Sequence, residues 1–369
     1  MVKQGLAARG WTYINCDAGW QEKVARVGDR RSPGPIRPNE KFSDMKEMIA
    51  DIHGLGLKVG LYSSPMIYTW GSGGGDIFVG TGEFPVDASR KLAFAPFGTE
   101  VNGIGSTRHC AEDARQWAEW GVDWIKYDWG RTEAALGAEM RRALDDTGRR
   151  MILQLCTQCR VAESNEYMRI AELVRGSEDS LDVWEGHRGV PALIRAADAW
   201  RGYSGAGHWY DPDMLVIGDL QTGTNRLTAA EQTLHFAYWA LAPAPLVLSC
   251  DLEKISPLAL ELATNEELIA INQDALVVPA KVEEHDGLRV ATRPLVGGRR
   301  AWGYFNLTDE PRIVQLPFAG VTDVRDVLSR RPFNGNSERL SLPPHSARVF
   351  TGRIIGATPP AAADAINIL

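Results

Sequence analysis

Acidic side chains follow strand-like segments of this sequence repeatedly. Five such segments end in aspartates: Asp17; Asp128; Asp179 and Asp182; Asp211 and Asp213; and Asp251. An aspartate at the end of a strand often only caps the next helix. Five strands that all present carboxylates to one rim of a sheet could also supply a nucleophile and a proton donor to one substrate.

Tryptophans lie within a few residues of these acids, namely Trp20, Trp70, Trp129, Trp184 and Trp209. A tryptophan by itself more often belongs to a core than to a binding site. Flat aromatic faces beside hydrogen-bonding carboxylates, however, are the combination that a sugar pocket requires. The pattern therefore predicts carbohydrate chemistry.

The elements that must position these residues alternate between strand and helix. Strands are predicted near 12–16, 57–63, 124–127, 151–155, 173–178, 207–210 and 245–249. Between them, Ser43 is expected to cap one helix, and Thr228 with Glu231 forms a capping box for another. This alternation predicts an α/β fold, a (β/α)8 TIM barrel, whose active site lies at the carboxyl ends of the strands.

Seven barrel strands are visible where eight are needed, so the first is expected to lie upstream of Met1 and the chain as written to be an incomplete barrel. After about Pro279 the pattern changes to short alternating segments separated by Gly-Gly, Asn-Gly and Pro-Pro turns, which predicts a small antiparallel β-sandwich. We therefore expect a catalytic barrel at 1–277, a β domain at 278–355 and a disordered tail at 356–369.

Composition excludes several classes of protein. The net charge is −7 without a basic block, so no nucleic-acid partner is expected. No apolar run reaches the roughly 18 residues of a membrane helix. Cys156 and Cys159 form a C-x-x-C pair without the second pair that a structural zinc site needs.

Any signal peptide would lie upstream of Met1, and a secreted or periplasmic protein is favoured over a cytoplasmic one. The oligomeric state stays open.

Six segments carry a resemblance to a known family. They are Y-I-N-C-D-A-G-W (13–20), G-L-K-V-G-L-Y-S-S (56–64), W-G-V-D-W-I-K-Y-D-W (120–129), G-H-W-Y-D-P-D-M-L-V-I-G (207–218), A-P-L-V-L-S-C-D-L (244–252) and I-A-I-N-Q-D (269–274). The chain resembles bacterial-type members of glycoside hydrolase family 27, the α-galactosidases and α-N-acetylgalactosaminidases. The resemblance is collinear from residue 1 to about 275 and implies a retaining hydrolase of terminal α-galactose or a galactose-like sugar, without metal or cofactor.

The resemblance also implies roles for individual residues. Asp128 of the K-Y-D run would be the nucleophile, and the ammonium of Lys126 on the same side of the strand would favour its ionised form. Asp179 would be the acid/base residue, because Arg175 precedes it by four residues and Trp184 follows it by five, although Asp182 competes for this role. The further residues implied to contact the sugar are Asp17, Trp20, Lys126, Arg175, Asp213, Met214, Cys156 and Thr157, and Asp211 would support their loop from behind.

Three departures from the family pattern bear on the substrate. Ala18 stands where the family usually has a second aspartate that binds the C4 and C6 hydroxyls. Thr157 after Cys156 replaces the glutamate with which galactosidases read the C2 hydroxyl, as in enzymes that accept an acetamide. The Gly-rich segment 70–76 is expected to form part of the rim. An α-N-acetylgalactosaminidase or a β-L-arabinopyranosidase is therefore an alternative to an α-galactosidase.

The sequence also leaves two other kinds of function open. Barrel-end acids could bind a divalent ion with help from His187 and His208, which would give a metal-dependent hydrolase sensitive to chelators. The absent first strand and Ala18 would also fit a sugar-binding remnant without turnover.

Overall fold

The computed structural model describes residues 1–29, 32–63, 86–94, 99–104, 110–128, 134–156, 159–220, 223–334 and 339–356. The chain forms two compact units. The first unit is Thr12–Arg175, and the second unit combines Met1–Trp11 with Gly176–Leu369. Among the described residues no helix is long and apolar enough to cross a membrane.

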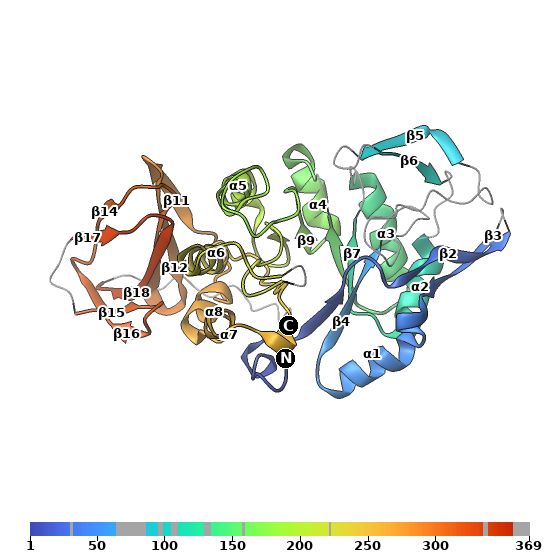
Figure 1. The fold of residues 1–369 in the computed structure, drawn as a ribbon, viewed down its shortest axis with the longest axis horizontal. Helices are drawn as coiled ribbons and strands as arrows, with labels where there is room; N and C mark the ends of the chain where they lie inside the picture. Colours follow the sequence, from blue (N-terminus) through green and yellow to red (C-terminus); the bar gives the residue numbers. More distant parts are fainter. Residues whose placement is uncertain are drawn as a thin grey trace. The chain divides into compact units, whose positions relative to one another are not determined.

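A parallel sheet forms the centre of the first unit (Figure 1). Its strands, in spatial and in chain order, are β1 (Tyr13–Cys16), β4 (Lys58–Ser63), β7 (Trp124–Tyr127), β8 (Ile152–Leu155) and β9 (Leu173–Val174). Leu61 pairs with Ile125, and Tyr127 pairs with Leu155. The strands predicted in this unit are confirmed, although the one predicted at 173–178 is only two residues long.

Gly60 on β4 shows how closely this sheet is packed. Its Cα lies beneath the side chain of Asn15 on β1, and a Cβ atom at position 60 would come within 1.9 Å of the Asn15 Oδ1. Any larger residue would have to displace Asn15, whose strand leads directly to Asp17. The glycine therefore allows the two strands that approach the predicted site to pair in this register.

Helices connect successive strands of the first unit, as the alternating pattern predicts. They are α1 (Met45–Gly54), α2 (Cys110–Trp120), α3 (Ala134–Asp146) and α4 (Ser164–Ile170). The prediction that Ser43 caps the first of them is wrong. Asp44 is the N-cap, because its carboxylate accepts a hydrogen bond of 2.8 Å from the backbone of Glu47.

Two antiparallel hairpins were not predicted. One joins β2 (Gln21–Asp29) to β3 (Ser32–Pro38), and the other joins β5 (Val86–Phe94) to β6 (Thr99–Ile104). They follow β1 and β4 in the chain, so both extend connections that leave the carboxyl ends of parallel strands. The Gly-rich segment 70–76, expected to form part of the rim, lies outside the described residues.

The second unit is centred on the buried helix α6. Its helices and its short strand are α5 (Val190–Ala196), β10 (Trp209–Tyr210), α6 (Ala229–Leu241), α7 (Pro257–Ala263) and α8 (Glu266–Asn272). The predicted capping box of α6 is confirmed, with Thr228 N donating to Glu231 Oε2 at 2.7 Å and Glu231 N donating to Thr228 Oγ1 at 3.2 Å. The helix is buried almost all round, and besides its apolar side chains it buries Glu231, Gln232 and His235.

Of two strands predicted in this unit, one is shorter than predicted and the other does not form. The segment predicted at 207–210 is a strand only over β10. At 245–249 no strand forms, and Leu248 instead makes an isolated parallel bridge with Leu215. The bridge is held by the Leu215 N–H, which donates to Val247 O at 2.7 Å.

An antiparallel β domain follows, as predicted. Its main sheet has the order β11 (Lys281–His285), β12 (Leu288–Leu295), β13 (Arg299–Asn306), β18 (Ser346–Ile354), β15 (Val321–Asp326) and β16 (Arg331–Pro332). A second pair, β14 (Arg312–Gln315) and β17 (Arg339–Leu342), completes it. Side chains alternate across β13, so Phe305 packs with the core around α6 while Trp302 and Tyr304 pack with Val314 and Leu342. The predicted tail lies, from residue 357 on, outside the described residues.

Candidate active site

A cation and a carboxylate meet at the carboxyl edge of the first unit's sheet. Lys126 near the end of β7 places its Nζ 2.5 Å from Oδ2 of Asp17, which directly follows β1. Burial by itself lowers the pKa of Lys126, but Cys156, Asp17 and Asp128 around it raise the pKa above its ordinary value. Lys126 is therefore a permanent cation at this edge.

Asp128 lies beside this pair. It follows β7, and its backbone N–H donates to Ser63 O at 2.8 Å, which continues the pairing with β4. The residue is half-buried, and its charge interacts with that of Lys126. The structure thus brings together Asp17, Lys126 and Asp128, three of the residues singled out from the sequence.

Trp20, which is predicted to contact the sugar, is buried. Its side chain is only 1% exposed. The indole N–H donates to Tyr62 O at 2.9 Å, and the ring meets Trp120 edge-on at 6.0 Å. Because so little of the ring is exposed, a sugar has almost no surface on which to stack. The contacts of the ring with Tyr62 and Trp120 instead stabilise the sheet next to β4.

Cys156 and Arg175 follow β8 and β9 at the same edge. Cys156 is buried, and its N–H donates to Tyr127 O at 3.0 Å. Arg175 is 1% exposed, and its N–H donates to Leu155 O at 2.9 Å. Thr157 lies outside the described residues. Burial and the nearby Asp128 raise the pKa of Cys159 to about 12, so the second thiol of the C-x-x-C pair is neutral near pH 7.

Asp179 belongs to the second unit. Its side chain is 57% exposed. Arg188 Nε donates to the Asp179 carbonyl oxygen at 2.7 Å, and Arg188 Nη2 lies 3.5 Å from Asp179 Oδ2. Arg188 was not singled out from the sequence, and no spacing rule connects residues nine apart across an irregular loop.

Asp213 organises the residues next to Asp179. Its Oδ2 accepts hydrogen bonds from Ser180 N at 2.6 Å and Ser180 Oγ at 2.9 Å. Its own N–H donates to Asp211 Oδ1 at 2.8 Å. The backbone of Asp213 is left-handed, with a φ of 86°, and Trp239 Nε1 secures it by donating to Asp213 O at 2.8 Å. Half-buried Met214 adjoins this turn.

The buried Asp182 carboxylate forms an ion pair with the exposed side chain of Arg226. Its Oδ1 lies 2.6 Å from Arg226 Nη2 and 3.1 Å from Arg226 Nε, and its Oδ2 accepts from Arg226 N at 3.0 Å. The hydrogen bonds from Arg226 hold the pKa of Asp182 below its usual range. A general acid must hold a proton near the working pH, so this environment disfavours Asp182 in that role.

We predict that Asp182→Asn lowers the free energy of unfolding at pH 7, because the buried Asp182 carboxylate loses its charged hydrogen bonds to Arg226. A depressed pKa stabilises the fold above the unfolded value of about 3.9, and this contribution is lost as the pH falls through the folded pKa. Urea unfolding of both proteins from pH 7 downward should therefore show a gap that closes in acid. A gap that stays constant or widens would contradict the ion pair.

Asp251 and the two histidines have ordinary surroundings. Asp251 caps the short helix Leu252–Lys254 by accepting from Glu253 N at 2.9 Å. His187 is exposed, and burial lowers the pKa of half-buried His208. In the described part of the chain no three His, Cys, Asp or Glu side chains are grouped in a way that could hold a metal ion.

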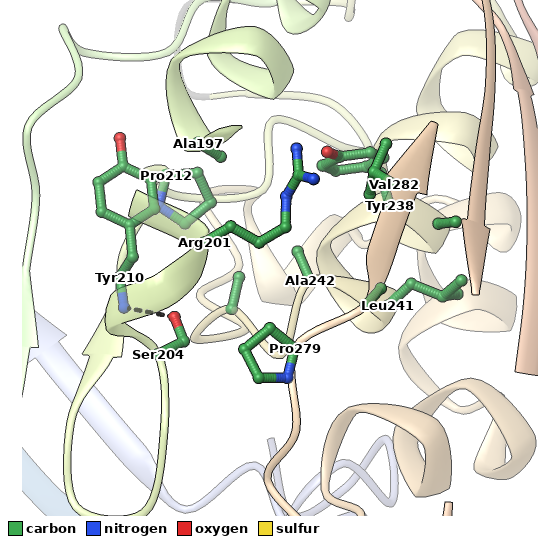
Figure 2. A pocket seen from close by; sticks show the side chains of 13 residues that line it. Ala197, Arg201, Ser204, Tyr210, Pro212, Tyr238, Leu241, Ala242, Pro279 and Val282 are labelled. Atoms are coloured by element: carbon green, nitrogen blue, oxygen red, sulfur yellow. Dashed lines mark hydrogen bonds between the residues drawn. The ribbon is translucent and has the colours of Figure 1, made fainter. Parts of the chain in front are cut away.

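A hollow within the second unit is lined largely by apolar side chains (Figure 2). Ser204 Oγ accepts a hydrogen bond of 3.0 Å from Tyr210 N at its wall, and the side chain of Arg201 extends across the same region. None of the aspartates discussed above lines this hollow. We assign it no part in the chemistry.

Comparison with known sequences gives consistent results. The family model described as alpha galactosidase A matches residues 97–274. An α-galactosidase of Oryza sativa is 28% identical, with 95% of this chain and 78% of the relative covered. A probable α-galactosidase of Dictyostelium discoideum is 30% identical, with 87% and 74% covered. An α-N-acetylgalactosaminidase of Gallus gallus is 29% identical, with 91% and 79% covered.

Solved structures show the same fold. A putative α-galactosidase of Bacteroides fragilis superposes with a TM-score of 0.77 at 26% identity, covering 96% of this chain and 73% of that one. A GH27 β-L-arabinopyranosidase of Geobacillus stearothermophilus, solved with arabinose, has the same TM-score at 21% identity and covers 95% and 92%. These similarities confirm the predicted order of a parallel α/β domain followed by an antiparallel β domain.

Proposed function

Because this chain belongs to glycoside hydrolase family 27, the family of α-galactosidases and α-N-acetylgalactosaminidases, we propose that it hydrolyses a terminal α-linked galactose or galactose-like sugar with retention of configuration. The chain is an α-galactosidase-like glycoside hydrolase. We propose which sugar it accepts and which role each residue has.

One observation carries the proposal furthest: the pairing of Lys126 with Asp17 beside Asp128. An ammonium and a carboxylate 2.5 Å apart at the edge of a sheet can donate to and accept from neighbouring sugar hydroxyls. The same ammonium stabilises the negative charge of Asp128, which a nucleophile must keep. The three groups thus combine sugar recognition with an ionised carboxylate.

In the first step Asp128 would attack the anomeric carbon and form a covalent glycosyl-enzyme while the leaving-group oxygen receives a proton. In the second step water would attack the same carbon from the opposite side and release Asp128. Two inversions give net retention. Lys126 would remain charged throughout, so its contribution to Asp128 and to the sugar hydroxyls does not vary during the cycle.

Asp179 would donate the proton in the first step and accept one from water in the second. Its exposed side chain fits a group that must reach the leaving oxygen and exchange protons with water. Asp182 is already committed to Arg226. The mechanism requires the carboxyl groups of Asp128 and Asp179 to come about 5–5.5 Å apart.

The remaining predicted residues would bind the sugar. Arg175 would contact a hydroxyl next to the anomeric carbon, and Cys156 with Thr157 would form the wall at C2. Asp213 and Met214 would also contact the sugar, and Asp213 already fixes Ser180. Trp20, which is buried, would act through the residues that it supports.

Ala18 favours a second candidate specificity on the same scaffold. It is exposed next to Asp17, and its N–H donates to Asp17 Oδ1 at 2.7 Å. A methyl group there leaves one fewer carboxylate for the C4 and C6 hydroxyls. A β-L-arabinopyranoside, which keeps the axial hydroxyl but lacks the C6 hydroxymethyl group, loses less from this change. An α-N-acetylgalactosaminide is the other competitor, because Thr157 is smaller than glutamate.

We predict that Ala18→Asp raises the preference for α-galactosides over β-L-arabinopyranosides by roughly ten- to a hundredfold in relative kcat/KM, since a charged hydrogen bond contributes about 1.5–3 kcal/mol. Ala18→Asn is the matched control, because it has the same shape without the charge and should shift the preference less. An unchanged or reversed preference in Ala18→Asp would show that another group already binds the C6 hydroxyl.

The proposal is tested by assaying one purified sample against nitrophenyl α-galactoside, α-N-acetylgalactosaminide, β-L-arabinopyranoside and a set of β-galactosides and glucosides. Turnover of one or more of the first three, unaffected by a chelator, is the expected result. Turnover that requires a divalent ion would favour a metal-dependent hydrolase. Sugar binding without any turnover would favour a non-catalytic carbohydrate-binding protein.

A further inference from the structure

The loop that carries Asp179 is closed by its own backbone. This loop, residues 179–190, is called the Asp179 loop. Leu181 N donates to Arg188 O at 3.0 Å, and Val190 N donates to Val183 O at 3.2 Å. Gly189 allows this closure, because a Cβ atom there would lie 2.3 Å from Trp184 O. These contacts make the Asp179 loop a closed turn.

Two anchors of the Asp179 loop lie close to Asp179 itself. Ser180 is held by Asp213, and Asp182 is held by Arg226. Both contacts come from segments that precede helix α6 in the chain. Neither reaches the outer end of the loop, where Trp184 lies.

At Trp184 the loop packs against the core around α6 and also contacts the C-terminal β domain. The ring of Trp184 stacks on the ring of His345, with 4.2 Å between centroids and 26° between planes. His345 lies between β17 and β18 of the antiparallel domain. It has a left-handed backbone, with a φ of 46°, at a turn where Ser346 Oγ donates to Pro343 O at 2.6 Å. The turn that presents the ring is itself hydrogen-bonded.

Both nitrogens of the His345 ring face carboxylates. Nδ1 lies 2.8 Å from Glu231 Oε1, and Nε2 lies 2.9 Å from Asp309 Oδ1. Glu231 is buried, and its other oxygen accepts from Thr228 in the capping box of α6. Asp309 is 87% exposed, so its pair with His345 is solvated and weak. The Glu231 contact thus fixes the ring plane against which Trp184 packs.

We propose that His345 is a positioning residue through which the C-terminal β domain holds the Asp179 loop in place for proton transfer. This inference rests on the proposed role of Asp179. Displacing a catalytic group by about 1 Å can cost up to a hundredfold in rate, so an anchor five residues from the acid matters to the acid step. It matters little to the attack by Asp128, which belongs to the other unit.

The test compares activated and unactivated substrates. His345→Asn removes the stacked ring, and asparagine tolerates the left-handed backbone at this position. We expect kcat/KM for a glycoside with a poor leaving group to fall roughly tenfold or more, whereas an activated nitrophenyl glycoside changes by less than about twofold. His345→Phe keeps a ring that can stack but lacks the nitrogen that contacts Glu231, so it should restore only part of the loss. His285→Ala, an exposed histidine on β11, is the control and should change neither rate.

Thermal unfolding of each variant sets an assay temperature well below its midpoint, so both rates refer to folded protein. An equal fall for both substrates in His345→Asn, or no fall for either, would overturn the positioning role. Those outcomes are distinct from failure of the proposed function, because a wild-type protein without turnover on any glycoside would fail before the variants are compared.

Discussion

Replacing Asp128 by asparagine is expected to lower kcat/KM by at least roughly a thousandfold on every glycoside that the wild type hydrolyses, because the amide cannot form the glycosyl-enzyme. The loss should be similar for every leaving group, because no other group can form the bond to the anomeric carbon that Asp128 provides. Steady-state rates with activated and unactivated glycosides measure it.

The matched control for this variant lies on the same strand. Asp123 immediately precedes β7, and its carboxylate binds Arg149 at 2.6 Å and His53 at 2.8 Å. Asp123→Asn should therefore reduce stability while leaving kcat/KM of the folded protein within about twofold. Comparable inactivation by both substitutions would indicate that position 128 acts through the fold, and substantial residual turnover in Asp128→Asn would exclude it as the nucleophile.

Replacing Asp179 by asparagine should produce a loss that depends on the substrate. Glycosides with poor leaving groups need a proton and should lose roughly a hundred- to ten-thousandfold in kcat/KM. Activated aryl glycosides need none for the first step, so they should still form the glycosyl-enzyme, and slow hydrolysis of that species should appear as a burst of released phenol. Rapid-quench or stopped-flow kinetics distinguish the two behaviours.

Two neighbouring acids serve as controls for Asp179. Glu178 is exposed and Asp182 is buried against Arg226, and neither Glu178→Gln nor Asp182→Asn should show a dependence on the leaving group. If Asp182→Asn showed the dependence and Asp179→Asn did not, the proton donor would be Asp182 and the assignment of Asp179 would fail.

Local sequence patterns predict much of this fold because they depend on near neighbours. The strands around β4 and β7, the capping box of α6 and the change to short alternating segments after Pro279 all follow from hydrophobic periodicity and capping chemistry. Ser43 was the wrong cap because two adjacent residues both suit that position, and only Asp44 reaches Glu47. The segment 245–249 is apolar like a strand but makes only the Leu215–Leu248 bridge.

The site is predictable where a motif puts its residues on one strand, as with Lys126 and Asp128. Its supporting contacts are not, because they join distant segments. Arg226 reaches Asp182 across 44 residues, and Glu231 reaches His345 across 114. Neither pairing leaves a periodic signal, and the depth of Trp20 likewise depends on how Tyr62 and Trp120 pack around it.

The central claim is a covalent glycosyl-enzyme on Asp128, and its most direct test is to trap that species. Asp179→Asn mixed with the best activated glycoside, quenched in acid and digested, should yield a peptide containing Asp128 whose mass is increased by one sugar residue, and Asp128→Asn should yield none. A sugar attached to another side chain, or no covalent species together with release of the inverted anomer, would contradict the account.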